Sequence, residues 1–113
     1  NRLVISIGVA YGSNIEKVSE ILVQIAREDP DVMKDPAPSV VFMQHGESSL
    51  DFNLRVFIPS PESIMVVRDR LNKRISREFE KHGIEIPFPQ RDLHIKSSAV
   101  RPQDLPLGNG SAV

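Results

Sequence analysis

The stretch that decides the fold is SLDFNLRVFI, residues 49–58. Its apolar residues fall at every second position, which is the period of a strand with one buried face. The polar residues between them turn to the other side, where Phe57 is the exception and indicates that a neighbour covers part of that face. Gly46 and the two residues after it supply a turn, and the apolar run at 40–43 precedes it. The pattern therefore predicts a hairpin whose second arm is the central strand of a sheet.

A strand and a helix are predicted before this hairpin. Apolar and polar residues alternate over 2–10, which is typical of a half-buried strand. Tyr11 and Gly12 then make a turn, and Ser13 with Glu16 has the spacing of a capping box. We expect the helix to begin at Asn14 and to end near residue 29, because a proline follows. A stiff connector with three prolines leads to the next strand at 39–44.

A second helix and a last strand are predicted after the hairpin. Ser60 and Pro61 provide a helix start, and Gly83 provides a C-terminal cap. Residues 84–90 are expected to run in an extended, proline-rich conformation with Ile84, Ile86 and Phe88 facing inward. Residues 92–96 read as a short strand, and 97–113 as a disordered tail.

The predicted order of elements is strand, helix, strand, strand, helix, strand. Two split crossovers then give an α+β, ferredoxin-like βαββαβ sandwich, with a four-stranded antiparallel sheet and both helices on one face. Residues 1–96 are expected to form this domain. Because the chain begins almost inside a strand, without methionine, we expect it to be part of a longer protein.

Composition argues against several classes of function. The chain has 113 residues, a net charge of −1 and no cysteine, so neither a broad nucleic-acid surface nor a thiolate site is expected. No apolar run is long enough to cross a membrane. The three histidines lie in separate elements, and the serines sit at caps and turns, so we expect no metal, no cofactor and no catalytic residues. The strands also lack the aromatic platform of RNA-binding domains with this topology.

Three sequence blocks carry a resemblance. They are Val9-Ala-Tyr-Gly-Ser13, Gly46-Glu-Ser-Ser-Leu-Asp-Phe-Asn-Leu-Arg-Val-Phe57 and Gly83-Ile-Glu-Ile-Pro-Phe-Pro-Gln90. In this order and spacing the chain resembles the cytosolic C-terminal domain of the small-conductance mechanosensitive channel family, including its potassium-efflux-system-like members. The resemblance spans roughly residues 3–96.

The resemblance implies a homo-heptameric channel of the bacterial inner membrane that opens under tension and releases ions and small osmolytes on hypo-osmotic shock. This domain would form part of a cytoplasmic cage and would have no enzyme activity. The structural or interface residues that the resemblance suggests are Tyr11, Gly12, Ser13, Gly46, Phe57, Gly83, Pro87, Phe88, Pro89 and Gln90.

Two other functions remain open at this stage. The first is a ferredoxin-like regulatory module that binds a small ligand at an oligomer interface. An acyl-phosphate hydrolase of the same fold is the weaker alternative, because the loop at 11–14 has no arginine to hold a phosphoryl group.

Overall fold

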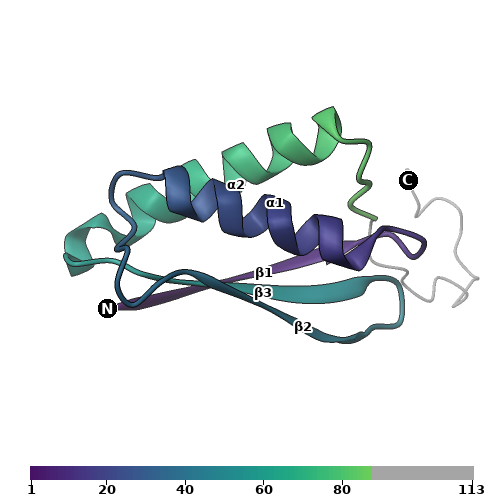
Figure 1. Cartoon of the computed structure of the whole chain (residues 1–113), viewed down its shortest axis with the longest axis horizontal. Helices are drawn as coiled ribbons and strands as arrows, with labels where there is room; N and C mark the ends of the chain where they lie inside the picture. The colour runs from purple at the N-terminus through teal and green to yellow at the C-terminus, as the bar shows by residue number, and fades with distance from the viewer. Residues whose placement is uncertain (88–113) are drawn as a thin grey trace, which may run out of the picture.

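The computed structural model describes residues 1–87, which form a three-stranded antiparallel sheet and two helices. The order along the chain is β1 (Arg2–Val9), α1 (Ile15–Glu28), β2 (Ser39–His45), β3 (Leu50–Phe57), η1 (Pro61–Ser63) and α2 (Ile64–Lys81). In the sheet the order is β1-β3-β2, so the prediction that the stretch at 49–58 holds a central strand is confirmed. Both helices lie on the same side of the sheet (Figure 1).

The sheet has a regular half and an irregular half. β1 pairs with β3 along its whole length, from Arg2 opposite Phe57 to Val9 opposite Leu50. β2 pairs with the other edge of β3, but its register shifts at Met43. The fourth strand, predicted at 92–96, falls outside the described residues, and the described sheet has three strands.

Helix α1 begins one residue later than the predicted capping box requires. Asn14 is the cap, and its side-chain oxygen accepts a hydrogen bond from the backbone N–H of Lys17 at 3.0 Å. The hydroxyl of Ser13 instead donates to the carbonyl of Ala10 at 2.7 Å. Asparagine is as good a cap as serine, so the helix takes the residue whose side chain the turn directs at the free N–H groups. The prediction that Ser13 caps the helix was therefore wrong.

Helix α2 ends where the sequence predicts, but its start differs from the prediction. Pro61 opens a single 3₁₀ turn, and the α-helix proper starts at Ile64. At the other end Gly83 has φ = 71°, the left-handed conformation that ends many helices. The N–H of Ile84 donates back to the carbonyl of Phe79 at 2.8 Å, which closes the last turn. The prediction of Gly83 as the helix stop is confirmed.

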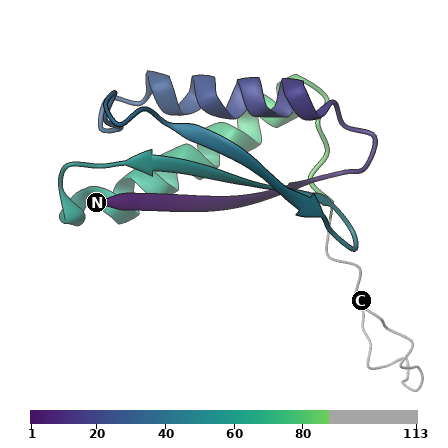
Figure 2. The ribbon, with the colours of Figure 1, turned by 60° about the horizontal axis from the view of Figure 1, so that its bottom comes forward.

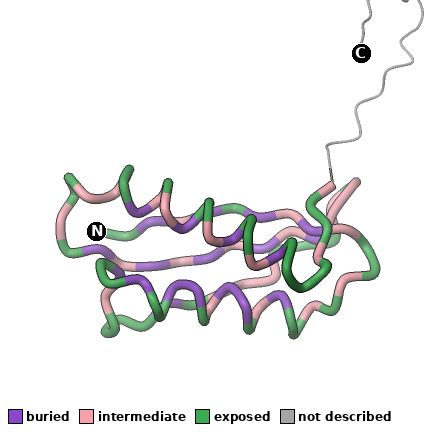
Figure 3. The backbone as a smooth tube through the Cα atoms, turned by 90° about the horizontal axis from the view of Figure 1, so that it is seen from above, coloured by how far each residue is buried: buried purple, intermediate pink, exposed green. Residues whose placement is uncertain are grey.

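The core lies between the sheet and the helix pair. All five alternate apolar residues of the stretch at 49–58 are buried, and so are the apolar stripes of both helices. Figure 2 shows the two helices packed over one face of the sheet, and Figure 3 shows buried residues along the inner sides of the helices and strands. The buried stripes are Val18, Ile21, Leu22, Ile25 and Ala26 in α1, and Val67, Leu71, Ile75 and Phe79 in α2.

The segment after α2 returns to the end of β1. Ala10 donates its backbone N–H to the carbonyl of Glu85 at 2.9 Å. Ile84 packs against the core as expected, but Ile86 is 49% exposed, so its predicted inward orientation was wrong. Phe88, Pro89 and Gln90, with the tail at 97–113, lie outside the described residues.

Candidate functional site: an interface at the turn end of the sheet

Most of the residues picked out by the sequence gather at one end of the domain. We call this the turn end: it consists of the β1–α1 loop (10–13), the β2–β3 hairpin (46–49) and the segment after α2 (83–87). These three segments lie at the same end of the long axis (Figures 1 and 2). They contain Tyr11, Gly12, Ser13, Gly46, Gly83 and Pro87. Phe57 lies at the opposite end, where it pairs with Arg2.

Tyr11 joins the loop to the hairpin. Its hydroxyl donates to the backbone carbonyl of Gly46, and its ring stacks on His45 with the ring centres 6.5 Å apart. His45 in turn meets the edge of Phe42 at 5.0 Å, and Phe42 packs on the buried Phe52 at 5.1 Å. Four rings therefore connect the core to the surface of the turn end, which fixes the relative position of loop and hairpin.

Two glycines make these turns close tightly. Gly12 has φ = 95°, a conformation that side chains disfavour. Gly46 is required for a different reason, because a Cβ there would lie 2.5 Å from a carboxylate oxygen of Asp51 and 2.9 Å from the carbonyl of Ser49. The hairpin thus folds its backbone directly against the first side chains of β3.

Asp51 organises the polar side of the hairpin. One carboxylate oxygen accepts the hydroxyl of Ser49 at 2.6 Å, and the other accepts the side-chain amide of Gln44 at 3.0 Å. These two hydrogen bonds lower the pKa of Asp51 below its usual value, since they favour the ionised form. The carboxylate therefore acts inside its own hairpin as an acceptor for both neighbours.

The turn end also exposes large apolar side chains. Tyr11 is 52% exposed and Ile86 is 49% exposed, and Met43, in β2 next to the hairpin, is also 49% exposed. At the opposite end of the domain, Met65 and Val66 in the first turn of α2 are 70% and 61% exposed. Side chains of this kind, held on a well-ordered framework, are suited to contact with another protein surface. Within residues 1–87 no three His, Asp or Glu side chains are placed to hold a metal ion, and no helix is long and apolar enough to cross a membrane.

A charged cluster that the sequence analysis missed joins the far ends of the two helices. Arg70 of α2 donates to both carboxylate oxygens of Asp29 at 2.7 and 2.8 Å, and to Asp31 at 2.8 Å. Burial of Asp29 raises its pKa, but the hydrogen bonds from Arg70 and from the backbone outweigh it, so the pKa lies below the usual value. Asp29 is 6% exposed, which makes it the buried charge of the described domain.

A second ion-pair row runs along the groove between the helices. Arg74 bonds Glu28 of α1 at 2.6 Å and Glu78 of its own helix at 3.4 Å, and His82 lies 3.7 Å from Glu78. Two i,i+4 ion pairs lie within α2, at Arg74–Glu78 and at Asp69–Lys73. Charges repeat every four residues on α2, and this repeat is the sequence feature that indicates ion pairs between the helices. The repeat does not indicate which acid on α1 each arginine of α2 meets.

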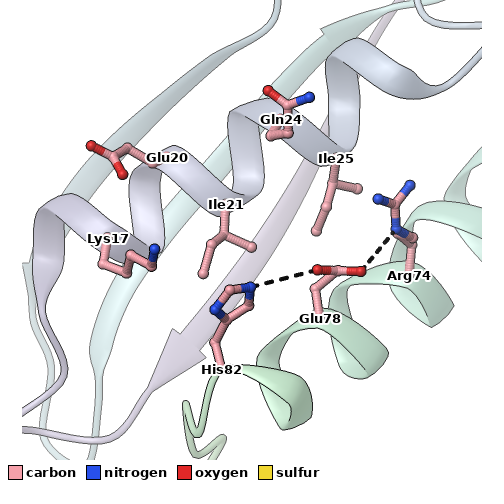
Figure 4. A pocket seen from close by; sticks show the side chains of 8 residues that line it. All are labelled: Lys17, Glu20, Ile21, Gln24, Ile25, Arg74, Glu78 and His82. Atoms are coloured by element: carbon pink, nitrogen blue, oxygen red, sulfur yellow. Dashed lines mark hydrogen bonds and ion pairs between the residues drawn. The ribbon is translucent and has the colours of Figure 1, made fainter.

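The groove over this row is shallow and lined by opposite charges. It encloses about 290 Å³ above Ile21 and Ile25, with Lys17 and Glu20 on its α1 side (Figure 4). The hydrogen bonds of Gln24 and of Arg74 lower the pKa of Glu28 at its margin. Since Arg74 and Glu78 in it already pair with each other, the groove serves helix packing.

Comparison with known proteins identifies the domain. Residues 3–86 match the family model described as "Mechanosensitive ion channel MscS, C-terminal". The chain is 44% identical over 97 residues to an uncharacterised MscS family protein of Haemophilus influenzae, covering 86% of this chain and 9% of that protein. It is 40% identical over 94 residues to the mechanosensitive channel MscK of Escherichia coli, covering 83% of this chain and 8% of that one.

A solved structure agrees with these sequence matches. The closed-state crystal structure of Helicobacter pylori MscS superimposes with a TM-score of 0.74 at 32% identity, over 87% of this chain and 39% of that one. The chain therefore spans under a tenth of the first two relatives and about two fifths of the solved channel chain. Because the family model covers nearly all of the described domain, the chain belongs to the MscS family of mechanosensitive ion channels, and its match lies in the C-terminal domain of that family.

Proposed function

We propose that this chain forms part of the wall of a cytoplasmic cage in a tension-gated channel of the bacterial inner membrane. The observation that carries this proposal is the family match over residues 3–86, which includes all of the described strands and helices except Arg2, the first residue of β1. The channel opens when hypo-osmotic shock stretches the membrane and releases ions and small osmolytes. The domain supplies structure and assembly, and it performs no catalysis.

The proposal includes assembly into a ring of seven copies. Two features of the domain support assembly: the exposed apolar side chains of the turn end, and a sheet face that no helix covers within the described residues. A ring requires each copy to present two different surfaces, one to each neighbour. A domain with a polar-edged sheet face on one side and a helix layer on the other can meet that requirement.

The activity is tested by expressing the full reading frame in a bacterial strain that lacks its own mechanosensitive channels. We expect the cells to survive a sudden dilution of the medium, and excised membrane patches to show pressure-activated currents. Normal membrane expression without either response would contradict the proposal. The mass of the purified protein in detergent gives the number of copies independently.

The turn end is tested by replacing Tyr11 with phenylalanine in the same full-length protein. The change removes the hydrogen bond to the Gly46 carbonyl and keeps the ring. We expect an altered pressure threshold or faster loss of assembled protein, since the loop is no longer held to the hairpin. Ser19→Ala, a small change on the other side of α1, serves as control. Identical behaviour of both variants would show that the Tyr11–Gly46 hydrogen bond takes no part in assembly or opening.

A further inference from the structure

An exposed apolar patch lies at the end of the domain opposite the turn end. We call it the entry patch, and it consists of Pro59, Pro61, Met65 and Val66, all of them exposed. Met65 and Val66, at 70% and 61%, are the most exposed large apolar side chains among residues 1–87. Single exposed apolar residues are common on protein surfaces, but several gathered on one short stretch indicate a contact surface.

The packing of α2 does not use Met65 or Val66. The helix buries a single stripe of side chains that runs from Val67 to Phe79. The exposed residues of α2 that follow Val66 are all polar or charged, which is usual for the outer face of a helix in water. The first turn of α2 is therefore the part of the helix that lacks this polar outer surface.

The N-terminus lies beside the entry patch. The backbone N–H of Ile58 donates to the carbonyl of Asn1 at 2.8 Å, so Asn1 is fixed next to the residue that precedes Pro59. Figures 1 and 2 both show the N-terminus near η1, which leads into α2. A chain that arrives at Asn1 from further upstream therefore arrives at the entry patch.

Proteins of this family have such an upstream part. The chain spans 39% of the solved Helicobacter pylori channel chain, and the matching family model is that of a C-terminal domain. A segment attached at Asn1 has a high effective concentration at the entry patch, because it is covalently held there. Its contact with the patch costs less entropy than the same contact made by a separate molecule.

We propose that the entry patch docks the segment that directly precedes Asn1 in the full-length protein, within the same copy. Apolar side chains of that segment cover Met65 and Val66. The contact fixes the orientation of the C-terminal domain relative to the part of the chain before it, in place of a free linker. This inference rests on the proposed place of the domain in a longer channel protein, and it adds how the domain is attached there.

The test uses the full-length protein in its membrane, with the photo-crosslinking residue benzoylphenylalanine in place of Met65. Illumination is expected to give a link within one copy, so the protein should keep its monomer size on a denaturing gel. Peptide mapping is expected to place the link in the residues before Asn1. Ile86, which is 49% exposed at the turn end, is replaced in the same way as a control and should give no link to those residues.

Substitution then tests the contact itself. Met65→Gln combined with Val66→Gln should raise the rate of proteolytic cleavage just before Asn1 at least about tenfold, the scale of losing the burial of two apolar side chains. Ile86→Gln should leave this rate within about twofold. Met65→Leu combined with Val66→Ile keeps the apolar surface and should keep the wild-type rate. The melting temperature of the 113-residue chain should not fall with the double glutamine change, because neither side chain packs inside the domain.

Three results would overturn the inference. They are a link from position 65 to a second copy, seen as a dimer-sized band, the lack of any link to the residues before Asn1, and a cleavage rate that the double glutamine change leaves unaltered. The currents and the survival after dilution decide the proposed function separately, because they do not depend on where position 65 links.

Discussion

The two faces of β3 differ in how fully the rest of the domain covers them. On the inner face Leu50, Phe52, Leu54 and Val56 are at most 4% exposed, under two helices. On the outer face the residues between them are all half-buried, with no helix above them in the described chain. One face of β3 is thus covered by the helices, and the other face is not covered by any helix of the described chain. The difference indicates that the fold's stability resides in the helix-covered layer, while the open layer is available for contacts.

The largest expected effect comes from breaking the inner face. Phe52→Ala removes a ring that is 1% exposed and packs on Phe42, so the free energy of unfolding should fall by about 4 kcal/mol. Urea unfolding of the 113-residue chain measures it. Asn53→Ala changes the next residue, on the outer face. It removes the hydrogen bond that Asn53 accepts from Ser6, and the free energy of unfolding should fall by about 1 kcal/mol. Equal losses would mean that the two faces do not differ as described.

The charge buried at the helix ends should give the next largest effect. Asp29→Asn leaves Arg70 with a weaker acceptor, and the loss should be about 2 kcal/mol. It stays below the cost of breaking a fully buried pair, because the Arg70 side chain is 39% exposed and keeps its contact with Asp31. Asp69→Asn, which breaks an exposed pair, is the control and should change stability by less than about 0.5 kcal/mol.

The carboxylate of Asp29 should also make the free energy of unfolding depend on pH. Since the pKa of Asp29 is lower in the folded chain, its contribution is present above the unfolded pKa of about 3.9 and is lost as the pH falls through the folded value. The difference in unfolding free energy between wild type and Asp29→Asn should therefore be constant from pH 7 to about pH 5 and should shrink below about pH 4. A difference that does not change down to pH 2.5 would rule out the ionised pair as its cause.

The smallest effect is expected on the open face. Val41→Thr keeps the shape of a half-buried side chain, and it should change the stability of the isolated chain by less than about 1 kcal/mol at low concentration. If copies of the full-length protein meet at this face, the same change should weaken their assembly. If the isolated chain loses as much stability as it does with Phe52→Ala, the open face is part of the core.

The sequence predicted the helix-covered face of β3 better than the open face, for a physical reason. Alternation over the stretch at 49–58 is a repeated signal, and each repeat independently favours the same buried face. Gly83 was predictable because a helix stop has a local geometric cause.

Single long-range choices were not predictable. The cap at Asn14 was assigned to Ser13, since both residues can accept the same hydrogen bond and the turn decides between them. The Asp29–Arg70 pair joins residues 41 apart, and the register shift at Met43 has no local signal. The resemblance suggested residues that the structure places at the turn end, but not that they lie together, and the Tyr11–Gly46 contact that joins loop and hairpin required the structure.

The hydrogen bond between Ala10 and Glu85 also determines how the domain would carry mechanical load. Asn1 precedes one end of β1, and Glu85 is bonded just past the other end of the same strand (Figure 1). A pull between these two points acts along β1, whose pairing with β3 is then loaded in shear, with all of its hydrogen bonds resisting together. The helices lie beside this line of force. Under such a pull the domain would lengthen little until the pairing of β1 with β3 breaks.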